Sequence, residues 1–220
     1  MEFLNALNYM LSKLPLFIEG AKVTIILTAT SMVFGTLLGL TGALCKVAHN
    51  KILNAIGYFY TWVFRGIPLL VQIYIIYYGL PGIGIEFDAW TASILAFSLC
   101  AGAYITEYIR GAILSIDKGQ MEASLSIGMT YAQAMRRVII PQTYRRLLPP
   151  LANEFIAILK DTSLVAVIAM VEILRRGQLI AAADFRPFEM YIEAGLVYLA
   201  LTTVASVLAY YLEKKLAARE

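Results

Sequence analysis

The chain of 220 residues is 60% hydrophobic and only 15% charged, with a formal net charge of +3. Soluble domains average about 45–50% apolar and about 25% charged residues, so this composition excludes an ordinary cytosolic enzyme, a disordered chain and a nucleic-acid-binding module. The two cysteines, Cys45 and Cys100, stand alone in apolar runs and indicate neither a disulfide framework nor a zinc site. We predict an all-α protein that crosses a membrane several times.

The N-terminal segment, residues 1–22, lacks the basic region and compact apolar core of a cleaved signal peptide. Its apolar side chains recur at helical spacing, at Phe3, Leu7, Met10, Leu11 and Leu14. We predict that this segment is an amphipathic helix lying on the membrane surface. The alternative is a frayed terminus.

Five apolar runs are long enough to cross the hydrocarbon core of a bilayer, which takes about 20 helical residues. They cover residues 23–45, 52–79, 89–107, 148–171 and 191–212. The second run contains Arg65 and also Pro68, where a helix can kink. The fourth contains charged residues that a lipid-facing helix would not tolerate.

The lysine and arginine residues between these runs are unequally distributed. One set of loops holds 11 of them and the other set holds 5. Because cytoplasmic loops carry the excess, we predict the N-terminus outside and the C-terminus inside. The only long loop, residues 110–146, is then cytoplasmic.

This long loop is predicted to be structured. Residues 120–138 are rich in helix formers and precede Pro141, which indicates one or two short helices. Gly128 permits a sharp turn between them. Such a helix, held between two spans, could pass a movement from a soluble partner into the membrane. The alternative is that the loop only connects two spans.

The charged side chains inside the spans must have partners, because each costs about 2.5–3.5 kcal/mol at the bilayer centre. We therefore expect these side chains to face protein, water or one another. For Arg65 and Glu107 we favour an ion-pair network that fixes helix packing. Lys160 is a candidate partner for Glu107, and a carboxylate is the candidate partner for Arg65.

Two carboxylates of the fourth span form a candidate substrate site. Glu154 and Asp161 are seven residues apart, so they project from nearly one helix face, about 10.5 Å apart along the axis. Lys160 lies about 100° around the helix and does not neutralise them automatically. The pair suits a ligand with a cation at each end, such as arginine or lysine. If the span unwinds there, Thr162, Ser163 and free backbone N–H groups would bind the ligand's carboxylate. The alternative is a purely structural break.

The long loop carries the most specific motif of the sequence. Glu122, Ala123 and Ser124 are followed after three residues by Gly128, and after nine more by residues 138–141, which end in Pro141. This spacing resembles the EAA loop of bacterial ABC importer membrane subunits, whose pattern is Glu-Ala-Ala, three residues, Gly, nine residues, then Ile-x-Leu-Pro. The departures from that pattern are small or conserve shape. Segments around Arg65, Glu107, Gln120 and Lys160 are similar to the polar amino-acid branch of that family.

The resemblance implies a permease subunit with five spans and a cytoplasmic coupling helix, located in the bacterial cytoplasmic (inner) membrane. It implies three partners: a second permease subunit, as a homodimer or heterodimer; an ATP-binding cassette subunit; and an extracytoplasmic amino-acid-binding protein. The residues it assigns to coupling are Gln120, Glu122, Ala123, Ser124, Gly128 and Pro141. It assigns gating or structural roles to Arg65, Pro68 and Glu107.

The expected function is ATP-driven import, by alternating access, of a polar and basic amino acid such as arginine. The sequence contains no phosphate-binding loop, so the chain is expected to hold no cofactor, with ATP and Mg bound by the partner subunit. An intramembrane enzyme is disfavoured because the only histidine is His49, in a short loop. An ion-coupled secondary transporter or a channel is the other alternative, although no internal repeat is visible.

Overall fold

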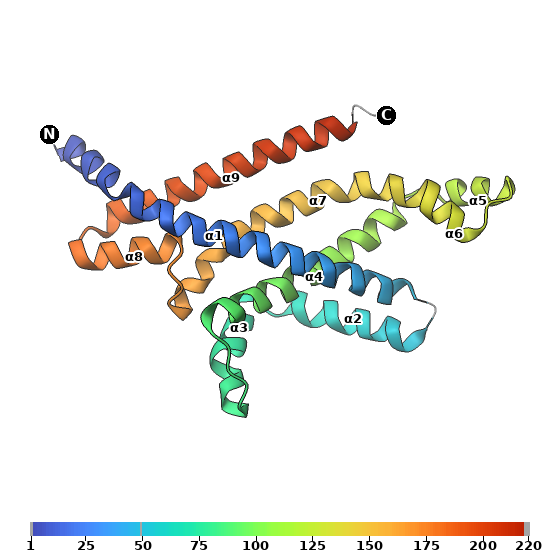
Figure 1. Ribbon diagram of the computed structural model, residues 1–220, viewed down its shortest axis with the longest axis horizontal. Coiled ribbons are helices and arrows are strands. Elements are labelled where there is room, and N and C mark those ends of the chain that lie inside the picture. The colour runs from blue at the N-terminus through green and yellow to red at the C-terminus, as the bar shows by residue number, and fades with distance from the viewer. Residues whose placement is uncertain (1, 49, 218–220) are drawn as a thin grey trace. The chain divides into compact units, whose positions relative to one another are not determined.

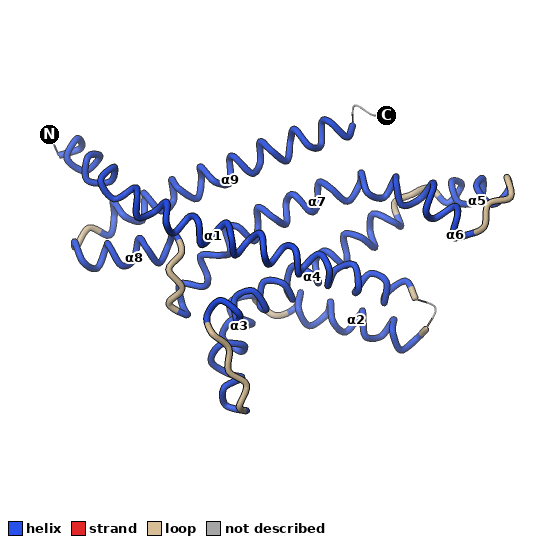
Figure 2. Tube along the Cα trace, viewed as in Figure 1, coloured by secondary structure: helices blue, strands red, loops and turns tan. Residues whose placement is uncertain are grey.

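The computed structural model describes residues 2–48 and 50–217, and every regular element in these ranges is helical (Figures 1 and 2). The α-helices are α1 (Glu2–Val47), α2 (Lys51–Gly66), α3 (Leu69–Tyr74), α4 (Ala89–Leu114), α5 (Lys118–Ser126), α6 (Tyr131–Ala134), α7 (Ile140–Asp161), α8 (Ile173–Asp184) and α9 (Pro187–Ala217). The π-helices are Ile75–Gly79 and Met135–Ile139, and the 3-10 helices are Leu80–Ile83 and Thr162–Ile168. The predicted all-α class is confirmed. His49 and the side chain of Phe3 lie outside the described residues.

Three of the described helices are long and apolar enough to cross a membrane, namely α1, α4 and α9. They contain the predicted spans 23–45, 89–107 and 191–212. Helix α2 together with Leu69–Ile83 passes the same test as one broken element, which gives up to four candidates. The predicted span 148–171 is not among them, because α7 is rich in polar and charged residues and ends at Asp161.

The predicted boundary at residue 22 does not exist as a break in the helix. Helix α1 continues from Glu2 to Val47, with Pro15 inside it. The apolar stripe of its first turns, Leu7 to Leu14, lines a cavity of about 230 Å³ together with residues of α9. Of this stripe, Met10 packs against buried residues of the chain, whereas Leu7 and Leu11 are exposed.

The second predicted span, residues 52–79, is not one helix. Helix α2 ends at Gly66, and Ile67 is extended, with its N–H donated to the carbonyl of Val63. A proline disfavours helical geometry in the residue before it, so Pro68 causes the break. The predicted kink at this proline is confirmed, and it separates α2 from α3.

The loop prediction at Pro141 was wrong in one respect, because the helix does not stop there. A helical run continues from Tyr131 through the π-helix into α7. The N–H of Ile140 bonds to the carbonyl of Met135, five residues back. Proline disrupts a regular helix through its missing N–H and its ring, and the wider π-turn directly before Pro141 accommodates both.

The chain divides into two compact units. The first comprises Met1–Met32, Leu69–Phe97 and Phe155–Val207, and the second comprises Val33–Pro68, Ser98–Glu154 and Leu208–Glu220. Each unit draws on segments far apart in the sequence, so each has its own packing.

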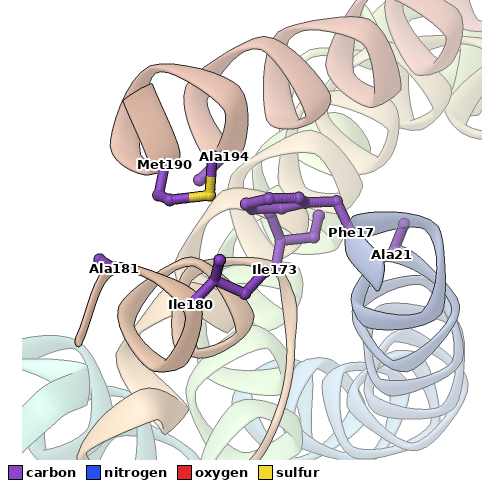
Figure 3. Close-up of a cluster of buried hydrophobic side chains, with 7 residues drawn as sticks. All are labelled: Phe17, Ala21, Ile173, Ile180, Ala181, Met190 and Ala194. Carbon is purple, nitrogen blue, oxygen red and sulfur yellow. The ribbon is translucent and has the colours of Figure 1, made fainter. Parts of the chain in front are cut away.

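The first unit has an apolar core at the meeting of α1, α8 and α9 (Figure 3). Its buried members are Phe17, Ala21, Ile173, Ile180, Ala181, Met190 and Ala194. The ring of Phe17 lies beside Met190 and Ile173 (Figure 3). The close packing of these side chains joins the three helices.

Polar contacts close the edge of this core. Asp184, the last residue of α8, accepts a hydrogen bond from the hydroxyl of Tyr9 at 2.5 Å and pairs with Lys13 Nζ at 2.6 Å. The Lys13 ammonium, and then the Tyr9 hydroxyl, lower the pKa of Asp184. Arg176 pairs with Glu19 at 3.0 Å, so α8 is tied to α1 at both of these points.

The second unit packs α1 against α4 through glycines. A Cβ added at Gly39 would lie 2.5 Å from Ile105 Cγ2, and one at Gly102 would lie 2.8 Å from Leu38 Cβ. Gly35, Gly39 and Gly42 thus form a stripe of small residues on α1 that provides close intrachain packing. The hydroxyl of Tyr60 donates to the carbonyl of Leu99 at 2.8 Å and adds α2 to this contact.

Candidate functional site

The coupling segment consists of two short helices, α5 and α6, joined by a turn, as predicted. Asp117 caps α5 by accepting a hydrogen bond from Gly119 N–H at 2.7 Å. Thr130 and Gln133 form a reciprocal capping box that starts α6. Gly128 lies between them with φ of +85°, a left-handed conformation that favours glycine over any residue with a side chain.

The motif residues of this segment divide between the inside and the surface. Ser124, which replaces an alanine of the family pattern, is buried, and its hydroxyl donates to the carbonyl of Gln120 at 2.7 Å. The replacement is therefore satisfied locally. Glu122 and Ala123 are exposed. Gln142, the residue after Pro141, donates a long hydrogen bond of 3.4 Å from its Nε2 to Gln120 Oε1.

An apolar surface accompanies the motif and was not predicted. The side chains of Leu125, Ile127 and Tyr131 are exposed on α5, the turn and α6. Ile127 is 75% exposed. Large exposed apolar side chains grouped on a short segment mark an interaction surface. Helical periodicity could not identify it, because the turn at Gly128 changes the face that each residue presents.

The predicted ion-pair network around Glu107 exists, but with other partners. Glu107 pairs with Lys46 Nζ and with Arg110 at 2.8 Å, not with Lys160. Lys46 also lies 4.2 Å from the ring centroid of Tyr58. Lys46 had been read only as a loop cation in the count of charges. It is in fact buried, and it connects the end of α1 to α4 and α2.

The described contact of Arg65 is with an aromatic ring. Its guanidinium carbon lies 5.2 Å from the ring centroid of Tyr104, and no ion pair of Arg65 occurs in the described part of the chain. A cation over an aromatic ring is worth about 0.5–1 kcal/mol at an exposed site. Arg65 and Pro68 thus stand at the break after α2.

Glu154 is a buried carboxylate with an aromatic partner. It is 7% exposed and accepts a hydrogen bond from the hydroxyl of Tyr108 at 2.9 Å. Tyr104 and Tyr108 are one helical turn apart on α4, so the neighbours of Arg65 and Glu154 come from a single helix. The spacing of four residues between the two tyrosines is the sequence signal that places them on one face of a helix.

The α-helical part of the fourth predicted span is interrupted at the residues weighed from the sequence. Helix α7 ends at Asp161, and a 3-10 helix follows from Thr162 to Ile168. Asp161 and Ser163 are partly buried, Thr162 is buried and Lys160 is exposed. In the described chain, Lys160 forms no ion pair, and the Asp161 side chain caps no backbone N–H of the 3-10 helix. The break therefore leaves a carboxylate and two hydroxyls close together in sequence.

The chain is similar to several known proteins. The family of binding-protein-dependent transport system inner membrane components matches residues 31–218. The probable amino-acid ABC transporter permease YckA of Bacillus subtilis is 39% identical over 98% of this chain and 96% of its own length. The arginine transport system permease ArtQ of the same organism is 36% identical, covering 93% of this chain and 94% of its own. The glutamine transport system permease GlnP of Escherichia coli K12 is 38% identical, covering 92% and 94%.

A solved structure agrees with these sequence matches. The crystal structure of an amino acid ABC transporter with histidines contains a chain that is 40% identical, with a TM-score of 0.91. The match covers 94% of this chain and 97% of that one. The fold and the EAA segment thus define an all-helical ABC importer permease.

The chain belongs to the family of binding-protein-dependent transport system inner membrane components. It is a permease subunit of an amino-acid ABC importer in the inner membrane. As a translocation component it is not an enzyme, and ATP hydrolysis belongs to a separate subunit. The ion-coupled transporter or channel weighed from the sequence receives no support from these relatives.

Proposed function

We propose that this permease moves a basic amino acid such as arginine, by alternating access, through a path lined by Glu154, Lys160, Asp161, Thr162 and Ser163. The observation that carries the proposal is the end of α7 at Asp161, followed by the 3-10 helix. Two carboxylates lie on this helix seven residues apart, and no lysine ion pair within the described chain neutralises Asp161. Carboxylates that face a membrane path favour a cationic ligand.

The relatives support the class of substrate. ArtQ is named as an arginine transport permease, and the solved relative was crystallised with histidines. GlnP is named as a glutamine transport permease. The amino acids in these names share a polar side chain, an α-amine and an α-carboxylate. The proposed preference for a second cation rests on the carboxylates of this chain.

The proposal includes five membrane crossings, with the N-terminus outside, and the partners that the family implies. An ATP-binding subunit, which holds ATP and Mg, would contact α5, the turn and α6 through Leu125, Ile127 and Tyr131. A second permease subunit and an external amino-acid-binding protein complete the importer. Because the EAA residues flank this exposed surface, a push on it would reach α7 through the continuous helical run from Tyr131 to Asp161.

Transport by the assembled importer in vesicles, with ATP inside and a panel of amino acids outside, tests the substrate. We expect arginine and lysine to compete better than glutamine. Asp161→Asn and Glu154→Gln should each raise the KM for arginine about 10- to 100-fold, because a hydrogen bond to a charged group is worth about 1.5–3 kcal/mol. Glu86→Gln, which changes an exposed carboxylate elsewhere, is the matched control and should leave KM unchanged. Better competition by neutral glutamine, or wild-type KM in both variants, would overturn the proposed substrate.

A further inference from the structure

Glu172 is a fully buried carboxylate that no sequence motif identified. It has 0% exposure and caps the N-terminus of α8. Its Oε1 accepts a hydrogen bond from Arg175 N–H at 2.7 Å, and its Oε2 accepts one from Leu174 N–H at 2.7 Å. Both oxygens are thus used on the first turn of α8, which fixes the position of the side chain.

Tyr198 of α9 connects this cap to the break in α7. The Tyr198 hydroxyl donates to Glu172 Oε2 at 2.5 Å, and the Tyr198 hydroxyl oxygen lies 3.4 Å from Thr162 Oγ1. Thr162 is the first residue after α7 and is buried. Glu172, Tyr198 and Thr162 therefore form a chain of polar contacts, which we call the 172–198–162 chain. Its link at Thr162 becomes a hydrogen bond when the Thr162 hydroxyl donates to Tyr198.

The two ends of this chain differ in their freedom to move. At Glu172 the backbone of α1 is in close contact, since a Cβ on Gly20 would lie 2.9 Å from Glu172 C. At Thr162 the hydroxyl has one proton and two acceptors within reach, because Thr162 Oγ1 also lies 2.7 Å from the carbonyl of Leu159. Tyr198 donates its only proton to Glu172. Toward Thr162, the Tyr198 oxygen can therefore act as an acceptor but not as a donor.

The choice of acceptor matters for the end of α7. The last carbonyls of a helix have no partner within it, and the Thr162 hydroxyl supplies one for Leu159. When Thr162 bonds to Tyr198 instead, that carbonyl is released. The orientation of Thr162, and with it that of its neighbours Asp161 and Ser163, is thereby linked to a fixed point on α8.

We propose that Tyr198 is a positioning residue of the substrate path, which acts on the segment 161–163 through Thr162 and is held by the buried cap Glu172. This inference rests on the proposed function, because it takes that segment to contact the substrate. Within the 172–198–162 chain, Glu172 and Tyr198 set the arrangement of the segment that binds substrate and contribute no substrate contact of their own.

A double-mutant cycle on the KM for transport tests the inference, using the assembled importer with its binding protein in vesicles. Tyr198→Phe and Thr162→Val should each raise KM about 2- to 10-fold, the value of one hydrogen bond, with kcat nearly unchanged. The double variant should be no worse than the worse single variant, because both changes break the same link. Thr162→Ser, which keeps the hydroxyl, should retain the wild-type KM. Tyr191→Phe, an exposed tyrosine on the same helix, is the matched control.

The outcomes separate this inference from the proposed function. A wild-type KM for Tyr198→Phe, or additive effects of the two changes, would overturn the role of Tyr198 while Asp161→Asn still raises KM. A wild-type KM for Asp161→Asn would overturn the proposed path itself. If Tyr198→Phe does not assemble, the KM values of Thr162→Val and Thr162→Ser are compared with Tyr198 in place. Equal KM values in these two variants would overturn the inference.

Discussion

Gly39 shows at the scale of one residue how closely α1 and α4 approach. A methyl group at this position would collide with Ile105, as the 2.5 Å separation shows. Both residues belong to helices that are long and apolar enough to cross a membrane. In lipid, helices associate through close packing and not through the exclusion of water, so small residues at the contact carry much of the stability.

Gly39→Ala is therefore expected to destabilise the protein although alanine favours a helix. Overpacking of this kind costs about 1–3 kcal/mol. The measurement is the free energy of unfolding of the purified protein in detergent. Gly111→Ala is the matched control on α4: nothing lies within 4 Å of its added Cβ, so this change should stabilise by about 0.5–1 kcal/mol.

A cycle with Ile105→Ala identifies the cause. The combination with Gly39→Ala should cost less than the two single changes added together, because the shortened side chain gives the new methyl group room. Strict additivity would show that the close contact at Gly39 is not the source of the lost stability.

At the scale of elements, the coupling segment joins a glycine turn to a continuous helix. Gly128 sets the turn between α5 and α6, and α6 leads through the π-helix into α7. The exposed side chain of Ile127 lies directly before that turn. A displacement of this surface therefore acts on an element whose other end is Asp161.

Ile127→Glu is expected to weaken association with the ATP-binding subunit about 10- to 100-fold, because a central apolar anchor of an interface is worth about 2 kcal/mol or more. The side chain is exposed, so the isolated permease should keep its helical content and its elution volume. Ile127→Leu keeps an apolar contact and should bind as the wild type does. Unchanged affinity of Ile127→Glu, measured by co-purification and titration, would exclude this surface as the docking site.

Local signals in the sequence were sufficient for several elements. Residues 120–138 predicted short helices, Gly128 permitted the turn between them, and the side chains from Asp161 to Ser163 favoured a helix break. Each of these signals acts within a few residues. Backbone competition by Thr and Ser side chains, for example, depends only on neighbouring groups.

The remaining features depend on residues far apart in the sequence. Nothing near Glu107 indicates that Lys46, 61 residues earlier, is its partner. Tyr198 and Glu172 are separated by 26 residues and were not associated. Pro141 was read as a stop because the π-turn that accommodates it has no clear sequence signature. Tertiary packing thus decided the partners of buried charges, and the local pattern could not.

For the whole molecule, the arrangement in the membrane follows from charge. The loops predicted to be cytoplasmic hold 11 lysine and arginine residues, against 5 in the other set. The family places the chain in the inner membrane, and the positive-inside rule then predicts which loops face the cytoplasm. The turn between α8 and α9 should face outward, and the turn between α5 and α6 should face inward.

Cysteine labelling tests this orientation. In a background of Cys45→Ser and Cys100→Ala, Phe185→Cys places a thiol at a position that is 88% exposed in the wild type, and Ser126→Cys places one on the exposed end of α5. A membrane-impermeant maleimide should label Phe185→Cys in right-side-out vesicles, and Ser126→Cys only after the membrane is opened. The cysteine-free background should not react. The opposite pattern would place the EAA segment outside, where no ATP-binding subunit could reach it, and would contradict the orientation on which the coupling mechanism depends.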